Sequence, residues 1–168
     1  MKIAVYGPLY NERSKSTIKI LIDYLKSKKA NVLFEKTFYE SIVTNSSIDL
    51  ISHGFNTFKV LDASYELLIS VGGDGTILRA ITYVKDLNIP IVGINTGRLG
   101  FLATIPMNKV ETALSEIFEG NYRISKRSLL AINIDGNEPG FDLNFALNEI
   151  SVSRKNTTSM ISIETVSF

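Results

Sequence analysis

The chain has 168 residues, of which 45% are hydrophobic and 21% charged, and its net charge at pH 7 is +1. This composition is typical of a soluble globular protein, and the balanced charge argues against nucleic acid or an acidic membrane as a partner. Cysteine is absent and His53 is the only histidine, which excludes disulfides, cysteine nucleophiles and metal sites built on thiolate or histidine clusters in this sequence. Without a signal-like N-terminus or a run of about 18 apolar residues, we expect neither secretion nor a membrane span.

The first 120 residues alternate strand and helix patterns. In chain order, the spacing of apolar residues predicts a strand at 2–6, a helix at 14–30, a strand at 31–37, a weak helix at about 40–52, a strand at 66–71, a helix at 76–88, a strand at 89–95 and a helix at 106–120. For the last helix, Asn108 is the predicted N-cap and Gly120 stands where a helix-ending glycine would. The alternation predicts an α/β fold with a doubly wound parallel sheet.

After Gly120 the character of the sequence changes. Three strand-like stretches, rich in Ile, Leu, Phe and Ser, occupy residues 123–135, 141–154 and 159–168. We therefore predict that residues 1–120 form an α/β nucleotide-binding domain and that residues 121–168 begin an antiparallel, all-β second domain. Because three final strands would leave an exposed sheet edge, we expect this sequence to be the front part of a longer protein.

The stretch Gly72-Gly73-Asp74-Gly75-Thr76 lies between a predicted buried strand and a predicted helix. It matches neither the P-loop nor the dinucleotide-binding fingerprint, although its position is right for a nucleotide. Ligands of α/β sheets bind at the carboxyl ends of strands, and the free N–H groups of a helix start favour an anion. In that setting, Asp74 could hold Mg²⁺ against phosphates or accept a proton from an attacking hydroxyl. The alternative is a turn in which Asp74 is only a local cap.

Three motifs in chain order resemble the NAD kinase family. The stretch Gly72–Thr76 is shared by NAD kinases, by diacylglycerol and sphingosine kinases and, with Ser in place of Thr, by phosphofructokinases. Residues Gly93–Leu102 (GINTGRLGFL) are similar to the second loop of NAD kinases, and Asn148-Glu149 is similar to their Asn-Glu pair. The resemblance covers essentially the whole chain. The later Gly-Asp-Gly and Thr-Pro-Thr-Gly-Ser motifs of the family do not occur by Phe168, so the resemblance implies a chain truncated within the C-terminal β domain.

The resemblance implies a bacterial, cytoplasmic phosphotransferase. Its expected reaction is the phosphorylation of the 2′-hydroxyl of the adenosine ribose of NAD by ATP, which yields NADP. NAD and ATP are then the expected small-molecule partners, a divalent cation such as Mg²⁺ is the expected cofactor, and a homo-oligomer is the expected assembly. The residues by themselves indicate only a nucleotide-type ligand on an α/β domain.

Each motif takes a role from the family. Asp74 would be the catalytic proton acceptor for the 2′-hydroxyl, and Gly75 would bind NAD through its backbone. Arg79, one turn into the following helix, would approach NAD or its phosphates. Asn148 and Glu149 would bind the adenosine half of NAD through side-chain hydrogen bonds.

Three residues of the second motif leave alternatives open. Phe101 either lines the adenine pocket as a flat aromatic surface or is a core residue beneath the loop. Arg98 is either a phosphate contact or a surface residue, and Asn95 either binds ligand or ties its own loop.

Two other functions compete with NAD phosphorylation. A lipid kinase of the diacylglycerol or sphingosine type would carry the same glycine loop, but it does not account for the loop at Asn95–Leu102 or for the lack of a membrane-binding stretch. A nucleotide-binding regulatory module without catalysis is the third hypothesis.

Overall fold

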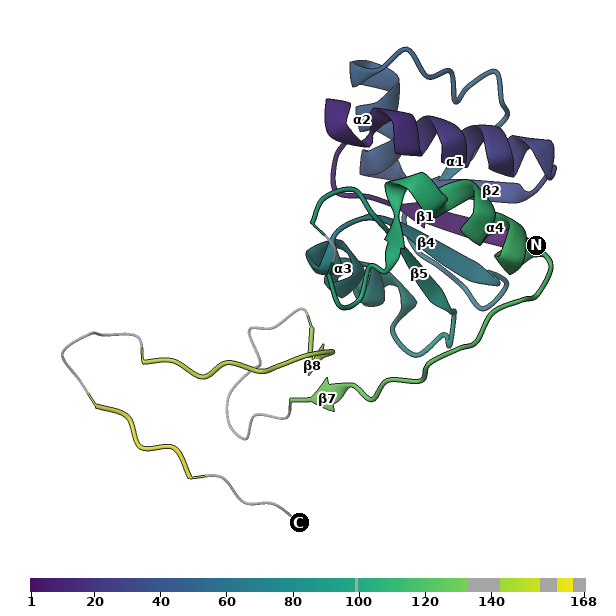
Figure 1. The fold of residues 1–168 in the computed structure, drawn as a ribbon. Helices are drawn as coiled ribbons and strands as arrows, with labels where there is room; N and C mark the ends of the chain where they lie inside the picture. The colour runs from purple at the N-terminus through teal and green to yellow at the C-terminus, as the bar shows by residue number, and fades with distance from the viewer. Residues whose placement is uncertain (99, 133–142, 155–159, 165–168) are drawn as a thin grey trace. The chain divides into compact units, whose positions relative to one another are not determined.

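The computed structural model describes residues 1–98, 100–132, 143–154 and 160–164. The chain forms two compact units, Met1–Ser125 and Lys126–Phe168 (Figure 1). The predicted domain assignment, 1–120 and 121–168, stays a prediction.

The first unit is built on one parallel sheet. Its strands are β1 (Lys2–Tyr6), β2 (Asn31–Glu35), β3 (Asn56–Phe58), β4 (Leu67–Gly72), β5 (Ile91–Asn95) and β6 (Ile105–Pro106). Its helices are α1 (Lys15–Ser27), α2 (Lys36–Asn45), α3 (Asp74–Val84) and α4 (Val110–Phe118), with short 3₁₀ turns η1 (Glu12–Ser14) and η2 (Met107–Lys109). The strand order is β3-β2-β1-β4-β5-β6 and every pairing is parallel, which confirms the predicted doubly wound α/β fold.

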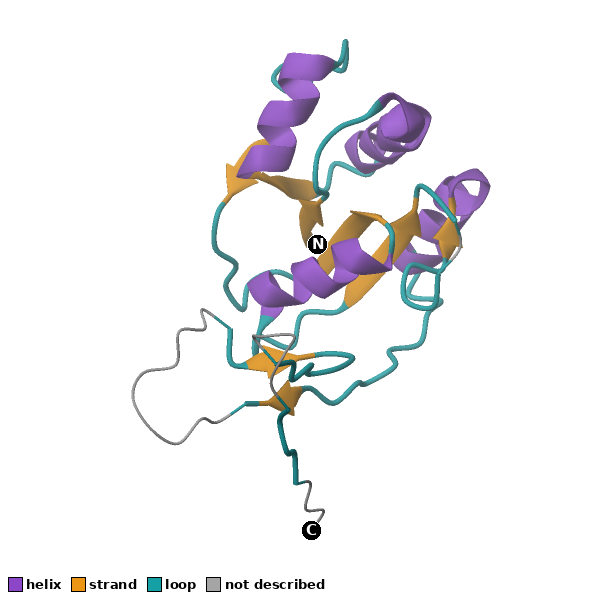
Figure 2. Ribbon diagram, turned by 90° about the vertical axis from the view of Figure 1, so that its left-hand side faces the viewer, coloured by secondary structure: helices purple, strands orange, loops and turns teal. Residues whose placement is uncertain are grey.

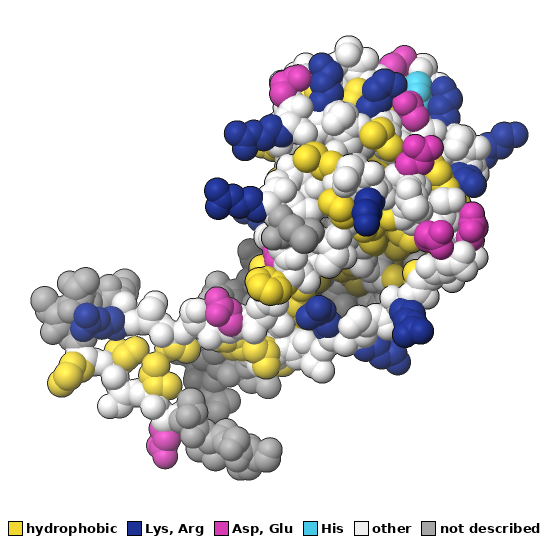
Figure 3. Space-filling model, viewed as in Figure 1, with side chains coloured by type: hydrophobic (Ala, Val, Ile, Leu, Met, Phe, Trp, Pro, Cys, Tyr) yellow, Lys and Arg dark blue, Asp and Glu magenta, His cyan; other side chains and the backbone are white. Residues whose placement is uncertain are grey.

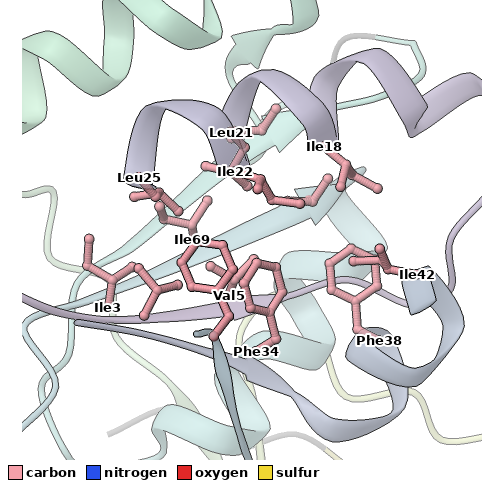
Figure 4. Close-up of a cluster of buried hydrophobic side chains, with 14 of the residues drawn as sticks. Ile3, Val5, Ile18, Leu21, Ile22, Leu25, Phe34, Phe38, Ile42 and Ile69 are labelled. Carbon is pink, nitrogen blue, oxygen red and sulfur yellow. The ribbon is translucent and has the colours of Figure 1, made fainter. Parts of the chain in front are cut away.

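Helices cover both faces of this sheet (Figure 2). Alternate side chains of β1 point to opposite faces, with Ile3 and Val5 in one core cluster and Ala4 and Tyr6 in the other. Helices α1, α2 and α4 pack on the first cluster, and α3 packs on the second. In the first cluster, the apolar side of α1 points at the side chains of β1, β2 and β4 (Figure 4).

Strand β4 is the most deeply buried strand of the sheet. All six of its residues are buried, as the continuous apolar run predicted. It pairs with β1 on one side and with β5 on the other, and its last residue, Gly72, lies opposite Asn95. The carboxyl ends of β4 and β5 therefore meet at the same point of the sheet edge.

The region between β2 and β4 differs from its prediction. The weak helix predicted at about 40–52 is α2, which begins earlier because the Glu35 carboxylate accepts the Phe38 N–H at 2.9 Å and caps the helix start. It ends at Asn45. The three-residue strand β3 was not predicted, since three residues are too few to show a period of two.

Helix α3 begins and ends before the predicted positions. Its first residue is Asp74 rather than Thr76, and Gly73 is its N-cap. It ends at Val84 because Lys85 has a φ of 49°, a left-handed conformation that does not continue a helix.

The predicted N-cap of α4 is wrong. Asn108 lies in the 3₁₀ turn η2, and Lys109 occupies the N-cap position of α4. The 3₁₀ turn takes up the first residues of the predicted helix, so the α-helix starts later than the sequence pattern. At the other end, Gly120 has a φ of 80° directly after the C-cap Glu119, which confirms its helix-ending role.

The second unit contains one antiparallel pair among its described residues. Strand β7 (Leu130–Ala131) pairs with β8 (Phe145–Ala146), which confirms the predicted change to antiparallel structure after the α/β part. These strands are much shorter than the predicted stretches 123–135 and 141–154, and parts of those stretches lie outside the described residues. Of the third stretch, 159–168, residues 160–164 are described and form neither helix nor strand.

The surface of the described residues carries both charges and apolar side chains. On the face of the first unit seen in Figure 3, Lys and Arg are interspersed with Asp and Glu. In the second unit, apolar side chains are exposed along the chain, among them Val152, Met160 and Ile163. No helix within the described residues is long and apolar enough to cross a membrane.

The two sides of α1 allow a test of the core. Leu21→Ala removes a side chain with 0% exposure and should lower the free energy of unfolding of the full-length protein by about 2–5 kcal/mol, because it leaves a cavity against the sheet. Ile20→Ala, on the exposed side of the same helix, is the matched control and should cost about 0.5 kcal/mol. Urea unfolding measures both. Equal losses would contradict the burial of Leu21 against the sheet.

Candidate active site at the carboxyl ends of β4 and β5

The glycine loop forms a tight turn from β4 into α3. A Cβ atom on Gly72 would overlap the side chain of Thr76, so only glycine allows the helix to start this close to the strand. The Thr76 hydroxyl accepts the Gly73 N–H at 3.2 Å and closes the turn. Asp74 thereby becomes the first residue of α3, where the N–H groups of Asp74 and Gly75 have no acceptor within the helix.

The Asp74 carboxylate binds the backbone of the loop that connects β5 to β6. Its Oδ2 accepts the Phe101 N–H at 2.8 Å, and its Oδ1 accepts the N–H groups of Leu102 at 2.9 Å and Ala103 at 2.8 Å. A Cβ atom on Gly100 would overlap this carboxylate. The β5–β6 loop is therefore closed onto the start of α3.

The base of the same loop is tied by Asn95, which is only 2% exposed. Its Oδ1 accepts the Gly97 N–H at 2.8 Å, and its Nδ2 donates to the carbonyl oxygens of Arg98 at 2.8 Å and Ala103 at 3.2 Å. Asn95 thus ties its own loop, the second of its two predicted roles. Arg98 is exposed.

These N–H groups explain how a carboxylate is tolerated in a loop suited to anions. The backbone N–H groups of Ala103 and Phe101, with that of Leu102, hold the pKa of Asp74 below its ordinary value of 3.8. The start of α3 adds the positive end of a helix dipole. Asp74 is therefore ionised at neutral pH, and its charge is compensated by its own surroundings.

The same surroundings do not fit a metal ion held by side chains. N–H donors and a helix N-terminus favour an anion and disfavour a cation at Asp74. Within the ranges that the structure describes, no group of three or more His, Cys, Asp or Glu side chains could hold a metal. The predicted divalent cation stays a prediction.

The side chain of Phe101 is exposed, although Asp74 closes the loop that carries it. Its side chain is 93% exposed, so the alternative of a core phenylalanine is wrong. A large aromatic side chain that is exposed to solvent near the carboxyl end of a buried strand offers a flat surface to a planar ligand. Gly75 is also exposed, and no atom lies within 4 Å of where its Cβ would be, so the first turn of α3 is open to an approaching group.

Arg79 lies on the part of α3 that faces the end of β1. Its guanidinium is close to the hydroxyl of Tyr6; burial raises the pKa of Tyr6 above 10.0, and the Arg79 charge opposes that shift. The sequence did not single out Tyr6. Its position in the chain could have indicated it. Tyr6 is the last residue of β1, which pairs with β4, and ligand-facing side chains of such sheets lie at the carboxyl ends of these strands.

Asn148 and Glu149 follow β8 after one intervening residue, Leu147, and belong to the second unit. Both are exposed and neither is part of a strand. This agrees with the rule that two adjacent polar side chains cannot share one face of a regular strand. The structure thus brings Asp74, Gly75 and Phe101 together in the first unit, whereas the predicted NAD-binding role of Asn148 and Glu149 stays a prediction.

A small cavity adjoins the base of the β5–β6 loop. Its volume is about 200 Å³ and its lining includes Asn95, Gly97 and Met107. Pockets that enclose ligands of nucleotide size measure about 300–1,000 Å³, so this cavity is too small to enclose one.

The strand order and the position of the glycine loop define a class of protein: a doubly wound α/β domain whose candidate site lies at the carboxyl ends of its central strands. Residues 8–122 match the family model described as the ATP-NAD kinase N-terminal domain. The chain therefore belongs to the NAD kinase family.

Curated relatives agree with this assignment. The chain is 49% identical to an NAD kinase of Flavobacterium psychrophilum and 46% identical to one of Christiangramia forsetii, in each case over 98% of this chain and 56% of the relative. It thus spans about half the length of the curated relatives it matches. The fold is similar to that of yeast NADH kinase, solved in complex with NADH, with a TM-score of 0.68 and 17% identity over 88% of this chain and 47% of that one.

The lowered pKa of Asp74 predicts how its contribution to stability depends on pH. A carboxylate whose folded pKa lies below 3.8 stabilises the fold above that value and loses the effect as the pH falls through the folded pKa. The stability difference between wild type and Asp74→Asn should therefore be constant from about pH 5 to 8 and shrink below about pH 4. Urea unfolding of the full-length proteins at a series of pH values measures it. A difference that changes between about pH 5 and 8 would argue against this hydrogen-bonded carboxylate.

Proposed function

We propose that the protein is an ATP-dependent NAD kinase, which transfers a phosphoryl group from ATP to the 2′-hydroxyl of the adenosine ribose of NAD and yields NADP. Membership of the NAD kinase family supports this reaction. The observation that carries it is an ionised Asp74 held at the carboxyl end of β4, beside an exposed Phe101.

Asp74 would act on the attacking hydroxyl mainly through alignment. A carboxylate with a lowered pKa is a weak base, because general bases work best when their pKa lies near the operating pH. Phosphoryl transfer has a loose transition state and depends mostly on positioning and charge, so a strong base is not required. Asp74 would accept a hydrogen bond from the 2′-hydroxyl and take its proton as the new O–P bond forms.

Phe101 and Gly75 would bind the adenosine around that hydroxyl. The 2′-hydroxyl is on the ribose carbon next to the one that carries adenine. Because the backbone N–H of Phe101 is 2.8 Å from Asp74 Oδ2, a hydroxyl at this carboxylate brings the base near the exposed ring. Gly75 would bind through its backbone N–H at the start of α3, and Arg79 would supply positive charge toward the phosphates of NAD.

Asn148 and Glu149 would bind the adenosine half of NAD through side-chain hydrogen bonds. Their exposed amide and carboxylate groups are suited to hydrogen bonds with ribose hydroxyls and the base edge. Mg²⁺ would arrive with the phosphates of ATP, since no group of three or more His, Cys, Asp or Glu side chains among the described residues could hold it by itself. A cytoplasmic location and a homo-oligomer stay predictions. No observation favours the lipid-kinase alternative.

Removing the Asp74 charge tests the catalytic proposal. Asp74→Asn should reduce formation of NADP in single turnover by about a hundredfold or more, the usual contribution of a positioned acid or base. Asp86→Asn makes the same change of charge at an exposed position and should keep the wild-type rate. If Asp74→Asn retains more than about a tenth of that rate, Asp74 is only a loop residue and the regulatory-module hypothesis gains support.

Glu149 allows a separate test of NAD binding. Glu149→Ala should raise the KM for NAD about tenfold, through the loss of a charge-assisted hydrogen bond, and leave the melting temperature unchanged because the side chain is exposed. Glu164→Ala, exposed in the same unit, is the control and should leave both quantities unchanged. Steady-state kinetics and thermal unfolding measure the two effects. A lowered melting temperature with a normal KM would make Glu149 a structural residue.

A further inference from the structure

Gly100 is a glycine for reasons of space rather than backbone conformation. Its φ is not in the left-handed region, so another residue could adopt its backbone angles. A Cβ atom there would overlap the carboxyl group of Asp74. Gly97, in the same loop, differs: its Cβ would meet only Asn95 Oδ1, at an ordinary 3.9 Å.

The hydrogen bonds of Asp74 leave one acceptor position open. A carboxylate offers about four lone-pair positions, two on each oxygen. Oδ1 accepts two N–H groups, from Leu102 and Ala103, whereas Oδ2 accepts one, from Phe101. The remaining position is on Oδ2, the oxygen bonded to the residue whose aromatic ring is exposed.

The β5–β6 loop has little freedom to absorb a shift at Gly100. Asn95 binds the backbone on both sides of it, at Gly97 and Arg98 before it and at Ala103 after it. Ala103 is itself buried, and its backbone contacts both Asn95 and Asp74. A side chain at position 100 would therefore displace the Asp74 carboxylate or break its bonds to the loop.

We propose that Gly100 is a positioning residue. The space beside it lets the Asp74 carboxylate close the β5–β6 loop through three N–H groups. The remaining acceptor position, on Oδ2, then points at the substrate hydroxyl. Gly100 acts through Asp74 and touches no substrate atom. The identity of that hydroxyl rests on the proposed function, whereas the closed loop rests on the described contacts alone.

The test compares Gly100→Ala with Gly97→Ala in the full-length protein. Hydrogen exchange of a peptide covering residues 96–104 reports whether the N–H groups of Phe101, Leu102 and Ala103 are bonded. Gly100→Ala should speed their exchange about tenfold or more, and Gly97→Ala should leave it unchanged. In the same variants, kcat for NADP formation should fall about tenfold or more with Gly100→Ala, with a smaller change in KM, because alignment rather than binding is lost.

The outcomes separate the parts of the proposal. Wild-type exchange in Gly100→Ala overturns the closed loop, and faster exchange with a normal kcat overturns the positioning role. If Gly100→Ala speeds exchange in every peptide, Asp74→Asn serves instead: faster exchange confined to residues 101–103 supports the closed loop, and unchanged exchange overturns it. If the wild type forms no NADP, the proposed function fails, while the exchange data still decide on the loop.

Discussion

The parallel pairing of β4 with β5 is the constraint on which the candidate site depends. It places Gly72 opposite Asn95, and the Thr96 N–H bonds to the Gly72 carbonyl at 3.1 Å. Since both strands run in the same direction, the loops that follow them leave the sheet at the same edge. Asp74 therefore reaches backbone groups 27 to 29 residues further along the chain.

The charge at Asp74 is compatible with a loop suited to anions because its partners are fixed backbone dipoles. Three N–H groups and the start of α3 stabilise the carboxylate without a cationic side chain. A lysine or arginine partner would neutralise the charge but would also occupy the space that a substrate needs. Backbone donors leave the partly exposed carboxylate accessible to solvent, which suits its proposed role as an acceptor of a hydrogen bond from a ligand.

The rigidity of the site comes from the two cores around the sheet. Leu68 and Ile69, on consecutive positions of β4, are fully buried in opposite clusters, so the strand that ends at the glycine loop is held from both faces. Sites on such strands are positioned more accurately than sites on free loops. The second unit differs, because Asn148 and Glu149 follow a two-residue strand.

The sequence by itself determined the elements that show their own periodicity or composition. The buried run that became β4, the amphipathic α1 and the glycine turn into α3 are local features, and their order implied a doubly wound sheet. Short elements such as β3 and the start of α4 were missed or misplaced, because two or three residues carry no period.

Only the tertiary structure decided how the two motif loops interact. Nothing local to Asp74 indicates that its partners are the N–H groups after Gly100, or that Phe101 is exposed rather than buried. Both follow from the register of β4 and β5 and from the space beside Gly100, which depend on residues far apart in the chain. Periodicity in the sequence indicates which face of an element is buried, whereas contacts between loops form only when the sheet has assembled.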